Sequence, residues 1–118
     1  MRGLIIKSPY IDDILSGIKK IEVRGSNTKI RERIVLLKSG TNLALGTVEI
    51  YDSKKMTLLN YINWDYNKLR GKFAKQKMPY KNTYGWKLKN PIIFKEPIPY
   101  AHPLGAMIWV TLPNNFID

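Results

Sequence analysis

The chain contains no cysteine and only one histidine, His102. Without thiols it can form neither a disulfide framework nor a thiolate zinc site, and one imidazole is too few for a histidine-based zinc centre. Any metal would have to be held by carboxylates. We therefore expect no metal site and no cofactor.

Long apolar runs are also missing. The run near the amino terminus has three consecutive apolar residues before Lys7, and no later stretch approaches the length of a membrane span. This pattern fits neither a signal peptide nor a transmembrane helix. We expect a cytoplasmic protein that does not bind membranes.

Acidic residues are scarce relative to basic ones. The sequence has 20 Lys and Arg but only 9 Asp and Glu, which gives a formal net charge of +11. A positive surplus of this size favours a negatively charged partner, with nucleic acid as the first candidate. The alternative is an ordinary solvated lysine surface, since Lys, Asn, Ile and Tyr are all frequent in this chain.

The length favours one folded domain, residues 1–118. A chain of 118 residues, 44% of them hydrophobic, can bury one core but not two. The functional site must therefore lie on or within this domain. Composition leaves its oligomeric state open.

Apolar spacing predicts two helices. The first is expected over Pro9–Ile18, with Ser8 as its N-cap and Gly17 at its end. The second is expected over Thr57–Leu69, with Thr57 as its cap.

The remaining apolar segments predict strands. They are Arg2–Lys7, Ile21–Arg24, Arg33–Lys38, Ala44–Asp52, Tyr84–Leu88, Ile92–Phe94 and Ala106–Leu112. Residues 39–42 predict a hairpin turn, the apolar run at 34–37 predicts burial on both faces, and residues 70–81 predict a basic loop. Pro97, Pro99 and Pro103 are expected to exclude regular central pairing before the last strand. The order predicts an α+β, mainly β fold, a mixed and partly closed barrel of about six strands with two helices.

One motif directly follows the first predicted helix. The residues from Gly17 to Arg24, GIKKIEVR, match the pattern GxKxxExR. Further matches lie at Ser8–Tyr10, Gly46–Asp52, Tyr84–Leu88 and Gly105–Trp109. With these residues, the chain resembles the ASCH domain family of the PUA-like superfamily over nearly its whole length.

The resemblance implies a PUA-like β-barrel with a cleft beside the GxKxxExR strand and a role in RNA recognition. It also implies hydrolytic activity in some members. Members that resemble amidohydrolases of acylated cytidine have a threonine nucleophile three residues after the lysine, whereas here Glu22 follows Lys19 at that distance. A carboxylate cannot simply replace that hydroxyl, so the departure argues against that particular activity.

Lys19, Glu22 and Arg24 are the central candidate residues. Alternation over Ile21–Arg24 predicts a half-exposed strand with Glu22 and Arg24 on its polar face, and Lys19 lies within reach at the preceding turn. Arg24 can bind phosphate or a base edge, Lys19 supplies a mobile charge, and Glu22 can accept from an amino or hydroxyl group. If the protein is an enzyme, Lys19 and Glu22 are the catalytic pair. The alternative is a structural ion pair, which at a surface contributes about 0–1 kcal/mol.

Four further residues are expected to contact the ligand: Ser8, Tyr10, Asp52 and Trp86. Asp52 is in phase with the core-facing residues of its predicted strand, although capping of a turn is equally consistent. Trp86 can stack on a base or pack in the core.

Basic residues after the motif and in the predicted basic loop are expected to contact phosphates. They are Lys29, Arg31, Arg33, Arg70, Lys72, Lys75 and Lys77. About six to ten such contacts would make binding steeply salt-dependent. A solvated lysine surface is again the alternative.

The leading hypothesis is a nucleic-acid-binding module that recognises a nucleotide of RNA, or a modified nucleotide, in a basic cleft beside the motif. The second hypothesis is a small hydrolase that acts on a modified nucleoside, as an amidohydrolase does, or on RNA, as a ribonuclease does. A protein-interaction domain has the least support, because no large apolar surface stripe is evident.

Overall fold

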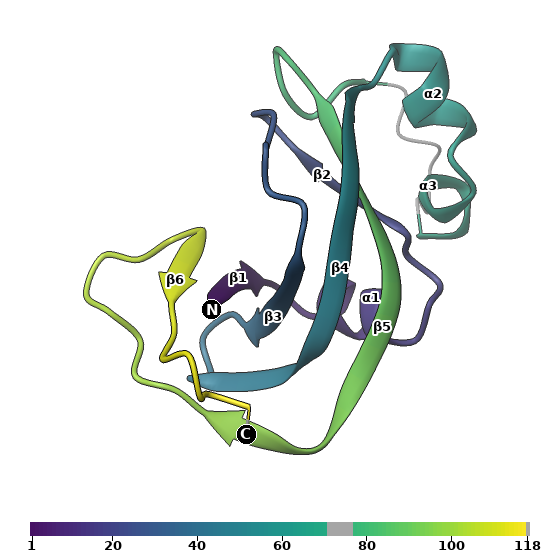
Figure 1. Cartoon of the computed structure of the whole chain (residues 1–118). Helices are drawn as coiled ribbons and strands as arrows, with labels where there is room; N and C mark the ends of the chain where they lie inside the picture. The colour runs from purple at the N-terminus through teal and green to yellow at the C-terminus, as the bar shows by residue number, and fades with distance from the viewer. Residues whose placement is uncertain (71–76, 118) are drawn as a thin grey trace.

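The computed structural model describes residues 1–70 and 77–117, which form six strands and three short helices (Figure 1). The strands are β1 (Arg2–Ile6), β2 (Ile21–Arg24), β3 (Arg33–Lys38), β4 (Leu43–Lys55), β5 (Tyr84–Pro99) and β6 (Trp109–Thr111). The helices are α1 (Tyr10–Leu15), α2 (Leu58–Asn63) and α3 (Asp65–Arg70).

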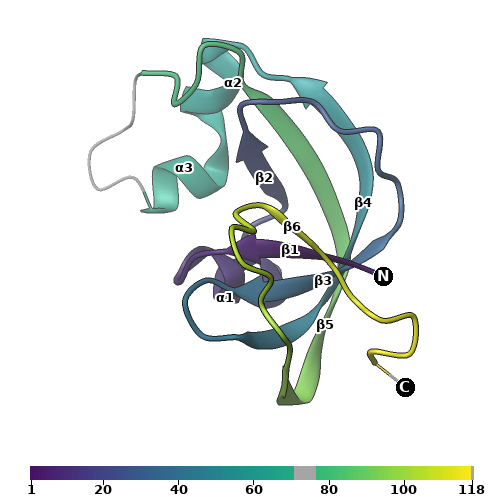
Figure 2. The same cartoon turned by 90° about the vertical axis from the view of Figure 1, so that its left-hand side faces the viewer.

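All six strands join one sheet in the order β2-β5-β4-β3-β1-β6. β1 pairs with β3 in parallel, and every other neighbouring pair is antiparallel. The long strands β4 and β5 curve, so the sheet curls into a half-barrel, with α2 and α3 near one end (Figure 1 and Figure 2). The predicted α+β, mainly β fold with a mixed and partly closed barrel is confirmed.

β3 and β4 form the hairpin predicted around residues 39–42. Gly40 and Asn42 in this turn have positive φ angles of 79° and 55°, which glycine and asparagine adopt more readily than other residues. β4 is longer than predicted and continues to Lys55. Its far end therefore leads directly to α2, which begins at Leu58.

β5 is one continuous strand where two short strands, Tyr84–Leu88 and Ile92–Phe94, were predicted. Pro99 lies opposite Leu43 of β4, so the strand continues beyond its predicted end at Phe94. β2 pairs with β5 only over residues 84–87, so the other half of β5 is an edge that tolerates residues without an N–H donor. β6 is shorter than the predicted strand at 106–112.

α1 differs from its prediction at the amino-terminal end. Its N-cap is Pro9, after a cis Ser8–Pro9 peptide bond, and no side chain caps the helix, so the expected Ser8 cap is wrong. Gly17 follows the helix with a φ of 87°, in agreement with its predicted role at the helix end.

The second predicted helix is two helices. Trp64 has extended backbone angles of φ −65° and ψ 122°, which end α2 and let the chain turn into α3. Thr57 caps α2 as predicted, because its hydroxyl accepts a hydrogen bond from the backbone N–H of Asn60 at 3.1 Å. Within residues 1–70 and 77–117, no helix is long and apolar enough to cross a membrane.

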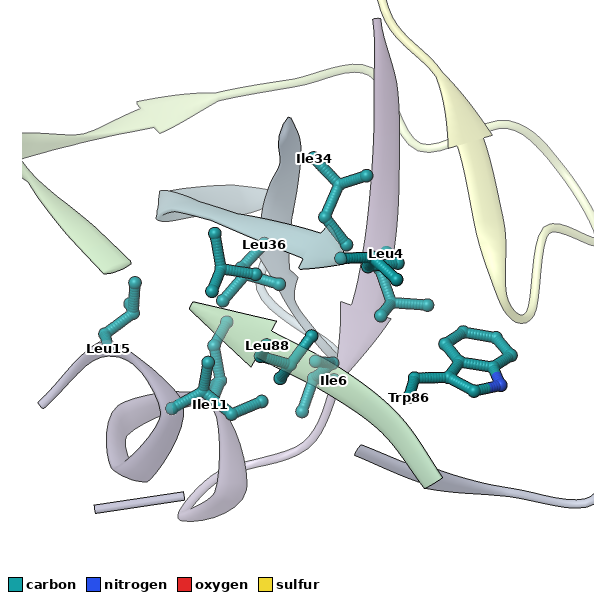
Figure 3. Packing of buried hydrophobic residues seen from close by; sticks show 11 residues of the cluster. Leu4, Ile6, Ile11, Leu15, Ile34, Leu36, Trp86 and Leu88 are labelled. Carbon is teal, nitrogen blue, oxygen red and sulfur yellow. The ribbon is translucent and has the colours of Figure 1, made fainter. Parts of the chain in front are cut away.

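Two clusters of apolar side chains pack against the two faces of β3. The first, shown in Figure 3, includes Leu4, Ile6, Ile11, Leu15, Ile34, Leu36, Trp86 and Leu88. The second includes Val35, Leu37, Ala44, Tyr100, Val110 and Leu112. Consecutive residues of β3 alternate between the clusters, which confirms the predicted burial of this strand on both faces.

Candidate functional site

A cleft of about 370 Å³ lies between β2, the end of β1 and the helices α2 and α3. Five aromatic residues of the described part of the chain line it: Tyr10, Tyr61, Trp64, Tyr66 and Tyr80. Its charged lining residues, among those the structure describes, are Lys7, Lys19, Arg24 and Glu22. The cleft therefore combines aromatic faces with an excess of positive charge.

β2 carries the motif into this cleft. Glu22 lies opposite Trp86 and Arg24 opposite Tyr84 in the β2–β5 ladder, so the two motif side chains share a face as predicted. That face is not the half-exposed one expected for this strand, because Glu22 is only 8% exposed. Aromatic residues from the helices line the same cleft and remove the carboxylate from bulk water.

Glu22 bridges the two cations of the motif. Its Oε1 lies 3.1 Å from Nζ of Lys19, and its Oε2 accepts from Nε and Nη2 of Arg24, each at 2.8 Å. This arrangement differs from a surface ion pair, because the side chains of Lys19 and Glu22 are only 5% and 10% exposed. Removing Glu22 would leave the two cations without the carboxylate that compensates them.

The ammonium of Lys19 lies among aromatic rings. Nζ is 4.9 Å from the ring centroid of Trp64 and 5.1 Å from that of Tyr66, within the range of cation–π attraction. Nζ also donates a hydrogen bond to the carbonyl of Ile21. Burial lowers the pKa of Lys19 below its ordinary value, although the charge of Glu22 acts in the opposite direction.

Arg24 connects strands that are not neighbours in the sheet. Its Nη2 donates to the carbonyl of Ile5 in β1 at 3.2 Å, across the open side of the half-barrel. Its Cζ lies 5.7 Å from the ring centroid of Trp86. The side chain remains 18% exposed, so part of the guanidinium group is accessible from the cleft.

Hydrogen bonds from α3 hold the aromatic wall in place. The hydroxyl of Tyr66 donates to Oδ2 of Asp13 in α1 at 2.8 Å, and the amide of Asn67 donates to the carbonyl of Tyr61 at 3.0 Å. The backbone N–H of Lys19 donates to the carbonyl of Asp13 at 2.9 Å. Asp13 thus links the wall to the start of the motif.

Of the other expected ligand residues, Tyr10 lines the cleft and Ser8 does not. The hydroxyl of Ser8 is exposed and lies 3.3 Å from a carboxylate oxygen of Asp12. Trp86 is 2% exposed, and its indole N–H donates to the carbonyl of Ser26 at 3.0 Å. Of the two roles considered for Trp86, the structure therefore places it in the core.

Asp52 lies outside the cleft. Its Oδ1 accepts from the backbone N–H of Ser53 at 2.8 Å, which matches the capping alternative. Its other oxygen lies 3.9 Å from Nζ of Lys54 and 4.0 Å from Nζ of Lys87.

Two of the arginines expected at phosphates make contacts within the protein. Arg31 donates to the carbonyl of Thr28 at 2.8 Å, and Arg33 binds the carboxylate of Glu49 at 3.0 Å. Neither lines the cleft. These contacts use both guanidinium groups within the protein.

The other cations expected at phosphates are placed as follows. Lys29 and Lys77 are exposed and do not line the cleft, and Arg70 is the last residue of α3. Lys72 and Lys75 lie outside the described residues.

Sequence reasoning missed most of the aromatic wall and also Lys7, which is exposed at the end of β1 and lines the cleft. Tyr61, Trp64 and Tyr66 were expected to belong to one helix that closes the barrel. The signal that could have identified them is the concentration of three aromatic residues within six positions. Neither glycine nor proline marks the helix break that turns Trp64 towards Lys19.

The arrangement suits a planar, negatively charged ligand. Aromatic faces can stack on a flat ring, while the guanidinium and ammonium groups can bind phosphate or polar ring edges. In the part of the chain that the structure describes, no three His, Asp or Glu side chains gather as they would around a metal ion.

Comparisons with known proteins agree with the observed fold. The sequence matches the ASCH domain family over residues 4–98. The crystal structure of ASCH from Zymomonas mobilis superposes with a TM-score of 0.70 at 11% identity, covering 97% of this chain and 88% of that chain. The search for curated relatives gave no match.

Two mutant structures of the Zymomonas mobilis protein are also similar. A serine-to-alanine mutant has a TM-score of 0.65 at 13% identity, covering 96% of this chain and 88% of that chain. A tyrosine-to-phenylalanine mutant has a TM-score of 0.63 at 11% identity, covering 96% and 90%. At these identities the solved structures establish the fold, and the family match extends over most of the sequence. The chain belongs to the ASCH domain family.

Proposed function

We propose that this ASCH domain binds single-stranded RNA and holds one nucleotide in the cleft beside β2. The observation that carries the proposal is that Lys19 and Arg24 line the same cleft as five aromatic residues of the described chain, with Lys19 beside the rings of Trp64 and Tyr66. Aromatic platforms stack on bases, and cations bind phosphates or base edges. The net charge of +11 supports the same conclusion, because it attracts a polyanion over a long range.

Glu22 has two roles in this proposal. It holds the two cations in place, and it retains capacity for the ligand. A carboxylate has about four lone-pair positions, and three donor atoms of Lys19 and Arg24 approach its oxygens. The remaining position can accept from an amino group of a base or from a ribose hydroxyl.

The size of the cleft favours an unpaired nucleotide over a duplex. A volume of about 370 Å³ is typical of small-molecule pockets and is much too small for a double helix. Sequence-specific RNA recognition usually uses such unstacked bases in single strands, loops or ends. We therefore expect tighter binding of single-stranded RNA than of the same sequence in a duplex.

The proposal can be tested by fluorescence anisotropy with labelled single-stranded RNA over a series of salt concentrations. Arg24→Ala and Lys7→Ala should each weaken binding, because both cations line the cleft. Arg2→Ala is the matched control, since Arg2 also pairs with a glutamate, Glu32, at 3.0 Å but lies outside the cleft. Salt-independent or absent binding, or an equal loss in the Arg2 variant, would contradict the proposal.

A hydrolase is a second candidate, because the pKa of Lys19 is lowered by burial. A lysine with a lowered pKa can take or give a proton closer to neutral pH than an ordinary lysine. Glu22 is less suited to be the base, since both of its oxygens are engaged by cations. Purified protein should be incubated with RNA and with acylated nucleosides. Turnover that survives Lys19→Arg and Glu22→Gln would exclude these residues as the catalytic pair.

A further inference from the structure

A second hollow adjoins the cleft at Trp64. It has a volume of about 500 Å³ and lies between α2 and the neighbouring ends of β4 and β5. Three lysines line it, Lys54, Lys55 and Lys87, and no carboxylate does so among the described residues. Trp64 lines both the hollow and the cleft, so the two sites share one aromatic wall.

We propose that this hollow is a second nucleotide pocket, which binds the nucleotide next along the strand from the one held in the cleft. The proposal rests on the proposed RNA binding of the cleft. A strand that passes over the edge of Trp64 enters the second pocket directly, because the same residue forms the wall of both. Proteins that bind single-stranded nucleic acid commonly hold several successive nucleotides in this way.

The lysines of the second pocket are available for a phosphate. Oδ2 of Asp52 lies 3.9 Å from Nζ of Lys54 and 4.0 Å from Nζ of Lys87. One carboxylate at these distances compensates two lysines only in part, and Lys55 adds a further exposed positive charge. A phosphate is the ligand whose charge complements this set.

The floor of the second pocket suits the flat face of a base. Ile21, Met56 and Gly85 form an apolar floor beneath the lysines. A Cβ atom at Gly85 would lie 2.9 Å from Cγ2 of Ile21 and 3.1 Å from Sδ of Met56, so these side chains close over the glycine and leave no gap. Leu59 of α2 is 69% exposed at the rim, where it can cover the edge of a bound base.

The test compares ligands of different length. Binding is measured for a mixture of the four ribonucleoside 5′-monophosphates and for random-sequence RNA of two, four and eight nucleotides. Lys55→Glu should weaken binding of the eight-nucleotide RNA by about tenfold, because a phosphate contact becomes a repulsion. It should leave mononucleotide binding in the cleft unchanged.

Lys95→Glu is the matched control, because Lys95 is an exposed lysine of β5 that lines neither hollow. It changes the total charge by the same amount and should alter RNA affinity less than twofold. The second pocket alone would be overturned if the two variants changed RNA affinity equally. It would also be overturned if Lys55→Glu did not change the affinity for eight-nucleotide RNA while Arg24→Ala still weakened it. Failure of the unaltered protein to bind any RNA would overturn both proposals.

Discussion

Nζ of Lys19 lies 3.1 Å from Oε1 of Glu22, and the two side chains are only 5% and 10% exposed. The same carboxylate binds Arg24 through its other oxygen. One buried negative charge therefore compensates two positive charges at the bottom of the cleft. This makes Glu22 the residue that allows Lys19 and Arg24 to remain close together in a position with little exposure to solvent.

Replacing the carboxylate should destabilise the fold. Glu22→Gln keeps the shape of the side chain but removes the negative charge that lies against both Lys19 and Arg24. Breaking a buried ion pair from one side typically costs about 3–5 kcal/mol. We expect a loss near the lower end of this range, about 3 kcal/mol, measured as the free energy of unfolding in urea.

Glu49→Gln provides the comparison for Glu22→Gln. Glu49 also pairs with an arginine, Arg33, at 3.0 Å, but the two side chains are 32% and 28% exposed. Solvent screening limits such pairs to about 1 kcal/mol or less. If the two variants lose the same stability, the Lys19–Glu22–Arg24 cluster does not carry the energetic role assigned to it.

Lys19 should make stability depend on pH in the alkaline range. Its pKa is lower in the folded protein than the value of 10.5 of an unperturbed lysine, chiefly because of burial. Between the two values the unfolded chain binds more protons than the folded one, so the free energy of unfolding rises with pH across that window. Below the folded pKa the destabilising effect of the buried charge is present in full.

This dependence can be isolated by comparing variants. The stability of the unaltered protein minus that of Lys19→Met should increase as the pH rises towards 10.5. Lys20→Met is the matched control, because Lys20 is the adjacent lysine and is exposed. A carbon-13 titration of the lysine side chains should place the midpoint of Lys19 below those of the other lysines. A midpoint at or above theirs would contradict the assignment.

The sequence predicted the parts of the site that depend on local spacing. Alternation along Ile21–Arg24 correctly placed Glu22 and Arg24 on one face, and the preceding turn correctly placed Lys19 beside them. The burial of that face could not be predicted in the same way. It depends on aromatic residues about 40 positions later in the chain, which come together with β2 only in the folded protein.

The errors in the fold have a similar origin. The prolines after Phe94 were expected to exclude central pairing, so the predicted strand ended there, although an edge strand can continue through proline. The register shows that β2 covers only one half of β5, which depends on the tertiary pairing. The break at Trp64 was missed because helical spacing continues through it without a glycine or a proline.

Gly46 should tolerate no side chain. A Cβ atom there would collide with the backbone carbonyl of Ile92 and lie 2.7 Å from Cδ2 of Leu15. Backbone atoms cannot move aside easily, so Gly46→Ala should cost about 3 kcal/mol by overpacking. Gly40→Ala has no such contact, and its positive φ of 79° should cost only about 1 kcal/mol. The melting temperatures of the two variants test this account. A lower melting temperature for Gly40→Ala than for Gly46→Ala would contradict it.

Trp64 should contribute more to RNA binding than any exposed aromatic residue outside the cleft. It forms the shared wall of the cleft and the second pocket, and its ring lies 4.9 Å from Nζ of Lys19. Loss of one stacking platform typically costs about 1–3 kcal/mol per base, so Trp64→Ala should weaken binding of eight-nucleotide RNA by about 5- to 150-fold. Trp64→Phe should retain part of the affinity, because an aromatic face remains.

Tyr51→Ala is the matched control for Trp64→Ala. Tyr51 is 47% exposed, and Nζ of Lys89 lies 5.0 Å from the centroid of its ring. Tyr51 lines neither the cleft nor the second pocket. Its removal should leave RNA affinity within twofold of the unaltered protein, as measured by anisotropy at the same salt concentration. A larger loss of RNA affinity for Tyr51→Ala than for Trp64→Ala would indicate that RNA passes over the face of β4 that carries Tyr51, and not through the cleft. A loss confined to Trp64→Ala supports a strand that passes through the cleft, because both variants remove one aromatic ring and no charge.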